Sequence, residues 1–148
     1  MQAKESLRGA ARRRSELEVA MQQVERTAAA PASGPVWVDN LTKSVRQLER
    51  AINQHIVEVE APSGLLEQIV DTAPRLQRNA EVTREHHVQL AQAATTLLNE
   101  LADAREAKPI PVAGIRTGVL DLLGELARHR QKGADLIYEA YDVDIGGY

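Results

Sequence analysis

Four long stretches of the chain repeat apolar residues at steps of three and four, and this spacing limits the possible folds more than any other feature. It is the period of an α-helix, and it places the apolar side chains on one face. The stretches cover residues 3–28, 37–60, 74–104 and 112–141. Proline and glycine separate them, as in the segments 61–64 and 108–111. We therefore expect four amphipathic helices.

The residue types available for a core also favour helix packing. The chain has no Phe, one Trp and three Tyr, so its core must consist of Leu, Ile, Val and Ala. A sheet is normally richer in aromatic and β-branched residues. A short apolar segment, residues 65–70, is expected to form a helix across one end of the molecule. The prediction is an all-α, up-and-down four-helix bundle with a short crossing helix between the second and third long helices.

A length of 148 residues indicates a single domain. Within it we expect a docking helix at 1–28, because its apolar face is thin, and a loop at 29–36. The bundle proper is expected at 37–142, followed by a tail at 143–148.

Several classes of protein are excluded or disfavoured. The absence of cysteine excludes disulfides, thiolate nucleophiles and zinc–thiolate sites. No phosphate-binding loop, nucleophile elbow or long heptad array is apparent, and no trio of nucleophile, base and orienting residue indicates an enzyme. Because no apolar run approaches ~18 residues, we expect a cytoplasmic protein without a membrane span.

The two ends of the chain carry opposite charge. Residues 1–14 hold five basic residues and one acidic residue (5 − 1 = +4), and residues 135–148 hold four acidic residues and no basic one (−4). This pattern predicts contact with a protein partner or a second copy of the chain. The alternative is two solvated helix faces. Acidic residues at positions 16, 18 and 25 interrupt the basic stretch, so nucleic acid is not expected. The candidate interaction residues are Arg12, Arg13, Arg14, Tyr138, Tyr141 and Tyr148.

Three histidines lie on apolar stripes of three different helices. His55 lies on the second, His86 on the third and His129 on the fourth. The third stripe is read as Val82, His86, Leu90, Ala93, Leu97 and Leu101, which turns His87 about 100° out of it. Helical bundles build metal sites from inward side chains on facing helices, so these three residues are candidate ligands.

Two carboxylates can join these histidines. Glu58 follows His55 by three residues and Glu125 precedes His129 by four, so each is a neighbour of its histidine on the helix surface. Glu60, five residues after His55, is expected to face elsewhere. A mixed imidazole and carboxylate set suits iron or manganese, and less selectively zinc. The alternative is that the histidines are hydrogen-bonded core residues without a metal.

The order of these residues over positions 41–142 resembles the hemerythrin-like (His-His-Glu cation-binding) family. The matching features are His55 with Glu58, a crossing apolar segment, Glu85-His86, and His129 with Asp135. The resemblance implies a four-helix bundle around a non-haem di-iron centre that binds or senses oxygen. For this chain we expect a mononuclear or a degenerate di-iron site.

The ligand set departs from the family pattern. Glu58 comes three residues after its histidine rather than four, and Asp135 comes six after His129 rather than five. A full di-iron site calls for five histidines and the chain has four. The expected function is therefore binding of iron or another transition metal by a reduced site, for oxygen, redox or metal sensing. The alternative is a metal-free interaction module that acts through the basic first helix and the acidic, tyrosine-containing tail.

Overall fold

The computed structural model describes residues 2–142, so the predicted tail at 143–148 lies outside it. The helices are α1 (Gln2–Ala29), α2 (Pro35–Glu60), α3 (Leu65–Thr72), the 3-10 helix η1 (Pro74–Leu76), α4 (Gln77–Ala104) and α5 (Val112–Tyr141). No strand occurs in the described part of the chain. The prediction of an all-α protein with four long helices packed together is confirmed.

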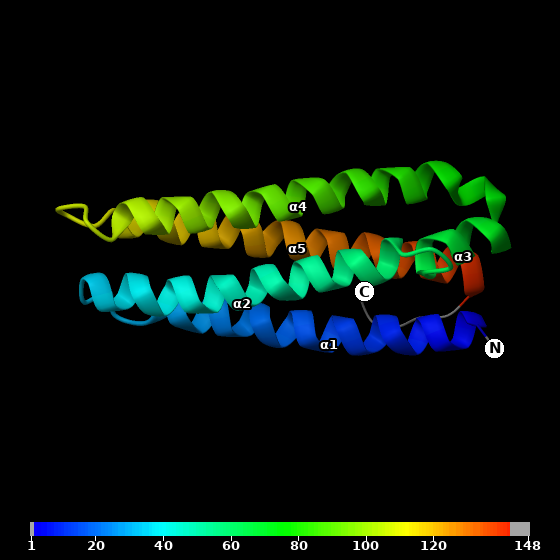
Figure 1. The fold of residues 1–148 in the computed structure, drawn as a ribbon, viewed down its shortest axis with the longest axis horizontal. Coiled ribbons are helices and arrows are strands. Elements are labelled where there is room, and N and C mark those ends of the chain that lie inside the picture. The colour runs from blue at the N-terminus through cyan, green and yellow to red at the C-terminus, as the bar shows by residue number, and fades with distance from the viewer. Residues whose placement is uncertain (1, 143–148) are drawn as a thin grey trace.

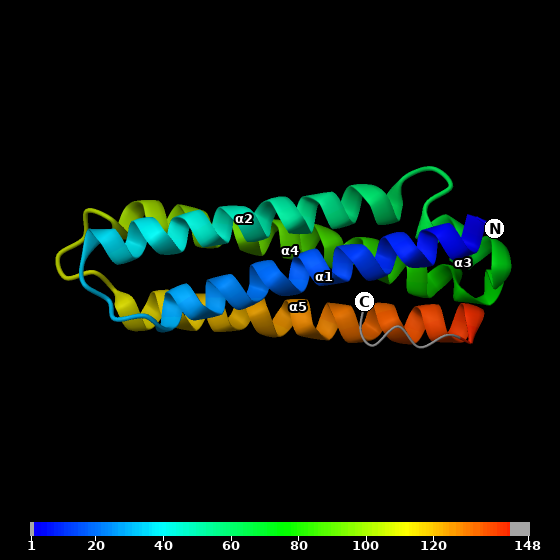
Figure 2. The ribbon, with the colours of Figure 1, turned by 90° about the horizontal axis from the view of Figure 1, so that it is seen from below.

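The four long helices pack around a common core. Each contacts two others, in the order α1, α2, α4 and α5, and α5 closes the ring by contacting α1. The two perpendicular views in Figures 1 and 2 show this arrangement, and the colour along the chain shows each long helix returning along the one before it. The short α3 contacts α1, α2, α4 and α5, so it closes one end of the molecule.

The buried positions of α4 alternate between steps of three and four, and those of α2 and α5 follow the same spacing with a few additional buried neighbours. In α4 they are Ala80, Thr83, His87, Leu90, Ala94, Leu97, Leu101 and Ala104. This alternation is the a/d pattern of a coiled coil, in which one seam of each helix faces its neighbours. The expectation that the chain lacks a long heptad array is therefore wrong. Small residues occupy several of the seam positions and make the pattern hard to see in the sequence.

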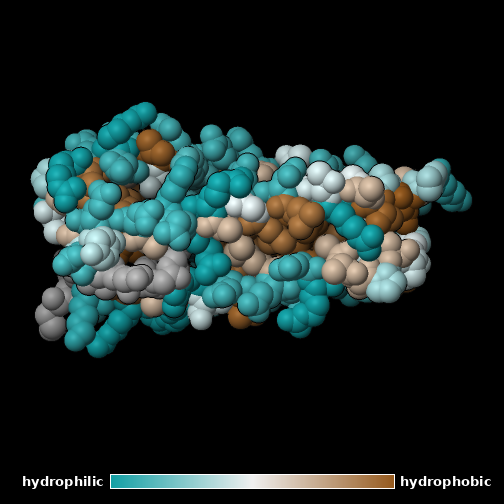
Figure 3. Space-filling view, turned by 180° about the vertical axis from the view of Figure 1, so that it is seen from behind, coloured by the Kyte–Doolittle hydropathy of each residue, from teal (hydrophilic) through white to brown (hydrophobic). Residues whose placement is uncertain are grey.

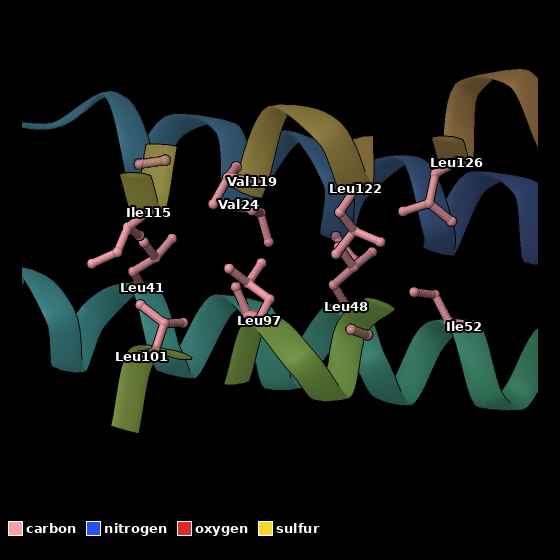
Figure 4. Close-up of a cluster of buried hydrophobic side chains, with 14 of the residues drawn as sticks. Val24, Leu41, Leu48, Ile52, Leu97, Leu101, Ile115, Val119, Leu122 and Leu126 are labelled. Atoms are coloured by element: carbon pink, nitrogen blue, oxygen red, sulfur yellow. The ribbon is translucent and has the colours of Figure 1, made fainter. Parts of the chain in front are cut away.

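The buried apolar side chains form two separate clusters along the bundle. The larger cluster lies toward the α1–α2 and α4–α5 loops, and it ends at Ile52, Leu90 and Leu126. Figure 4 shows Ile52 and Leu126 at one side of the group of labelled side chains. The smaller cluster lies at the α3 end and includes Val59 and Ala80. A layer between the two clusters is therefore free to hold polar side chains.

The first helix is fastened to the rest of the bundle at its C-terminal end. Arg116 of α5 donates hydrogen bonds to the carbonyl oxygens of Ala28 (2.9 Å) and Ala30 (3.0 Å). Its guanidinium carbon also lies 5.4 Å from the ring centroid of Trp37, whose indole N–H donates to the carbonyl oxygen of Thr27 at 3.2 Å. Thr27 and Ala28 lie in the last turn of α1, where carbonyl groups lack an i+4 helical partner; Thr27 also accepts from the backbone N–H of Ala30 at 3.3 Å.

The surface is mixed in character. On the face shown in Figure 3, hydrophobic side chains gather in the middle and toward the end with the two interhelical loops, and hydrophilic side chains predominate at the α3 end. Within residues 2–142, no helix has the length and apolar composition that crossing a lipid bilayer requires.

Candidate metal centre

Three buried histidines from three helices fill the layer between the two apolar clusters. They are His55 of α2, His87 of α4 and His129 of α5, with exposed fractions of 3%, 1% and 4%. Each occupies a seam position, one turn from a residue of the larger cluster. The repeat that builds the core therefore also turns these three imidazoles inward.

The helix lengths bring the three histidines to the same level along the bundle. His87 lies 17 residues before the end of α4 (104 − 87), and His129 lies 17 residues after the start of α5 (129 − 112). Because the two helices meet at the 105–111 loop and return along each other, equal distances from that loop give equal heights. His129 therefore lies level with His87 along the bundle axis.

The three imidazoles are close enough to share one ion. One potential ligand nitrogen from each of the three rings lies within 4.8 Å of the other two. The Nε2 atoms of His55 and His129 are 3.2 Å apart, close to the ~3.3 Å that two nitrogens span in a tetrahedral site with metal–nitrogen bonds of about 2.0–2.1 Å. The ring centroids lie 4.8–5.4 Å apart, and the rings meet edge to face. This buried cluster can hold a metal ion.

Glu60 orients the histidine of α4. Nδ1 of His87 lies 2.6 Å from Oε2 of Glu60, so the ring N–H donates to the carboxylate. The other carboxylate oxygen lies 3.9 Å from Nε of Arg84. With Nδ1 protonated, Nε2 of His87 carries a free lone pair, and this atom is buried without a hydrogen-bond partner among the described residues. A carboxylate that fixes the tautomer of a ligand histidine is a common feature of metal sites.

Burial keeps the three imidazoles neutral near pH 7. It lowers the pKa of His55 from 6.5 to about 3, with a further contribution from His87. It lowers the pKa of His129 to about 2, and neighbouring groups, Lys132 among them, act in the same direction. For His87, burial also lowers the pKa, against the opposing effect of Glu60. Neutral imidazole is the form that binds a metal.

The structure places the predicted ligands unevenly. His55 and His129 belong to the buried cluster, as expected. The expected inward orientation of His86 is wrong, because His86 is half-buried and its neighbour His87 takes the inward position. Glu58 and Glu125 are exposed and stand outside the cluster. Glu125 lines a surface cleft beside His129.

The expectation that Glu60 faces elsewhere is also wrong, because it contacts His87 directly. Two signals in the sequence could have identified the correct residues. A seam through Ala80, Thr83 and Ala94 places His87 inward. The neighbouring stripe, which includes Val82 and Ala93, is at least as apolar and places His86 inward instead. Once His87 is inward, a carboxylate at the end of the neighbouring α2 can reach it.

The predicted interaction residues do not form one exposed group. Arg12 and Tyr138 are exposed, whereas Arg14 and Tyr141 are half-buried. The side chain of Arg13 and the whole of Tyr148 lie outside the described part of the chain. A contact surface made from the two ends therefore stays a prediction.

A comparison of the chain with family models, curated proteins and solved structures finds no significant match.

Proposed function

We propose that this protein binds one divalent first-row transition-metal ion through His55, His87 and His129. The observation that carries the proposal is the buried layer of three neutral imidazoles, one of them oriented by Glu60 with its second nitrogen unsatisfied. A buried polar atom without a partner destabilises a fold by about 1–3 kcal/mol. A metal ion would satisfy this nitrogen.

The donor atoms indicate the class of metal. Imidazole nitrogens suit zinc, iron, nickel and copper, whereas calcium and magnesium prefer oxygen ligands. Three protein ligands leave at least one coordination position open, as in catalytic zinc sites rather than structural ones. We therefore propose an iron or zinc site that takes an exogenous ligand and serves oxygen, redox or metal sensing.

We also propose that the chain is an up-and-down bundle related to the hemerythrin-like family, with a mononuclear site in place of a di-iron centre. Two observations support this relation. The histidines come from the second, third and fourth long helices, and helices consecutive in the sequence are neighbours in the bundle. Within the described residues α1 contributes no ligand, which agrees with a reduced set.

Titration of metal-free protein with Zn²⁺, Fe²⁺ or Co²⁺ tests the proposal. We expect one equivalent of metal to bind. Each of the variants His55→Gln, His87→Gln and His129→Gln should weaken binding by more than about 100-fold, because loss of a residue that only supports a ligand already weakens binding by up to about 100-fold. The matched control is His86→Gln, which alters the adjacent half-buried histidine and should leave affinity nearly unchanged. Stoichiometric binding that survives all three ligand variants would contradict the proposal.

A further inference from the structure

A surface cleft between α4 and α5 lies directly beside the histidine layer. We call it the α4–α5 cleft, and its polar lining consists of His86, Gln89, Glu125, Arg128, His129 and Lys132. Its volume is about 170 Å³. A second cleft of about 350 Å³ shares His86, His129 and Lys132 with it. His55 and His87 line neither cleft, so His129 marks the side of the layer from which a small molecule can approach.

The α4–α5 cleft has a net positive charge. It holds the cations Arg128 and Lys132 and the single carboxylate Glu125. No ion pair or side-chain hydrogen bond joins any of these three groups to another described residue. Nη1 of Arg128 instead lies 3.5 Å from the position that a Cβ atom would take at Gly124, one helical turn away. Both cations are therefore available to a ligand.

The electrostatic influence of Lys132 reaches the metal layer. Burial is the main cause of the low pKa of His129, and the charge of Lys132 adds to it. The acidic residues of the neighbouring second cleft are engaged elsewhere. Asp135 accepts a hydrogen bond from Gln131 at 3.0 Å, and a carboxylate oxygen of Glu139 lies 3.8 Å from Arg75. Of the carboxylates that line the two clefts, Glu125 therefore opposes a negative charge bound between Lys132 and the metal, and the two cations Arg128 and Lys132 outweigh it.

We propose that the α4–α5 cleft admits a small carboxylate anion to the open coordination position of the metal, with Lys132 as its counter-charge. This inference rests on the proposed metal site. The three ligand imidazoles are neutral and the Glu60 carboxylate lies behind His87 rather than on the ion, so an anionic fourth ligand is favoured over a neutral one. A planar carboxylate can bind the metal with one oxygen and accept charge-assisted hydrogen bonds from Lys132 or Arg128 with the other.

Cobalt-loaded protein provides a readout that does not depend on activity. The visible spectrum of Co²⁺ reports its coordination, and acetate is the probe, with acetamide as a neutral molecule of the same shape. We expect acetate to change the spectrum in a saturable way and acetamide to leave it unchanged at equal concentration. In Lys132→Gln the spectrum without acetate should match that of the wild type, and the acetate dissociation constant should rise about tenfold, as for the loss of one charge interaction.

The matched control is Lys43→Gln, since Lys43 is an exposed lysine of α2 in a different cleft. It should leave acetate binding within about twofold, the range expected for a remote surface charge. If acetate does not change the spectrum, if acetamide acts equally, or if Lys132→Gln binds acetate as well as the wild type, the inference is wrong while the metal site stands. If Co²⁺ itself does not bind through the histidines, both proposals are wrong.

Discussion

At the scale of single residues, the site depends on how one imidazole is shared between two partners. His87 donates through Nδ1 to Glu60 and leaves Nε2 toward the other two rings. Arg84 lies 3.9 Å from the second oxygen of Glu60, which holds the carboxylate at the edge of the bundle. An outer carboxylate of this kind fixes the ring orientation and raises the basicity of the ligand nitrogen.

Replacing the carboxylate tests this arrangement. Glu60→Gln keeps the shape of the side chain but removes its charge, and we expect metal affinity to fall by about 10- to 100-fold, the usual effect of losing an outer partner. Competition with a chelator of known affinity measures the change. Glu58→Gln is the matched control, because Glu58 is exposed on the same helix turn and outside the cluster. Equal losses in the two variants would show that Glu60 has no special role.

The buried imidazoles also predict how the metal-free protein responds to acid. Each has an ordinary pKa near 6.5 in the unfolded chain and a lower pKa in the folded protein. Between these values the unfolded chain binds more protons, so the free energy of unfolding falls as the pH decreases below about 6.5. Each histidine contributes up to about 1.4 kcal/mol per pH unit.

Urea unfolding of chelator-treated protein at pH 7.5, 6.5 and 5.5, followed by circular dichroism, measures this dependence. Removing one of the three titrating groups in His55→Gln should make it shallower. A pH dependence identical to that of the wild type would mean that His55 is not held neutral in the fold.

At the scale of helices, the sequence predicts where each helix lies better than which face is buried. Proline and glycine mark the ends, so α5 was predicted with its observed bounds, residues 112–141. The face of α4 was misread by one position, since Val82 and His86 appear as apolar a stripe as Ala80, Thr83 and His87. Small residues fit the seam where neighbouring helices approach closely. The pattern of a single helix does not show where that approach occurs.

Gly64 lies in the break between α2 and α3, where there is little room for a side chain. A Cβ atom at Gly64 would lie 2.7 Å from the carbonyl oxygen of Ala61 and 2.8 Å from that of Glu58. These are backbone atoms at the end of the helix that carries Glu60, so Gly64→Ala should lower the free energy of unfolding by about 1–3 kcal/mol through overpacking.

Gly114 has room for a side chain, unlike Gly64. It lies in α5 with nothing within 4 Å of an added Cβ atom. Gly114→Ala should raise the free energy of unfolding by about 0.4–1 kcal/mol, because it restricts the unfolded chain. Urea unfolding of both variants measures the two effects. If Gly64→Ala is as stable as the wild type, the end of α2 has room that the structure does not indicate.

At the scale of the whole molecule, the histidine layer is a property of the bundle rather than of any one helix. The sequence predicted His55 and His129 as inward residues but left their relative heights open, because height depends on the lengths of all the helices and loops between them. Counting from the shared 105–111 loop places His87 and His129 level. The contact with Glu60 depends on α2 and α4 packing side by side, which no local pattern contains.

The same histidine layer interrupts the hydrophobic core of the bundle. The three polar rings separate two apolar clusters that leucine at the same positions would join. Replacing buried polar groups by apolar side chains of similar size is neutral or stabilising, whereas an unsatisfied buried nitrogen is unfavourable by about 1–3 kcal/mol. We therefore expect the triple variant His55→Leu, His87→Leu, His129→Leu to be more stable than the wild type by about 2 kcal/mol when a chelator is present.

Metal should reverse this order. Zinc at 100 times its dissociation constant should stabilise the wild type by about 2.7 kcal/mol and leave the triple variant unchanged, because an ion that binds only the folded state shifts the unfolding equilibrium by mass action. Urea unfolding with chelator and with zinc measures both proteins, and His86→Leu is the control for a histidine outside the layer. A triple variant less stable than the wild type in chelator would mean that the imidazoles stabilise the metal-free fold. The layer would then be a structural feature rather than a feature maintained for a ligand.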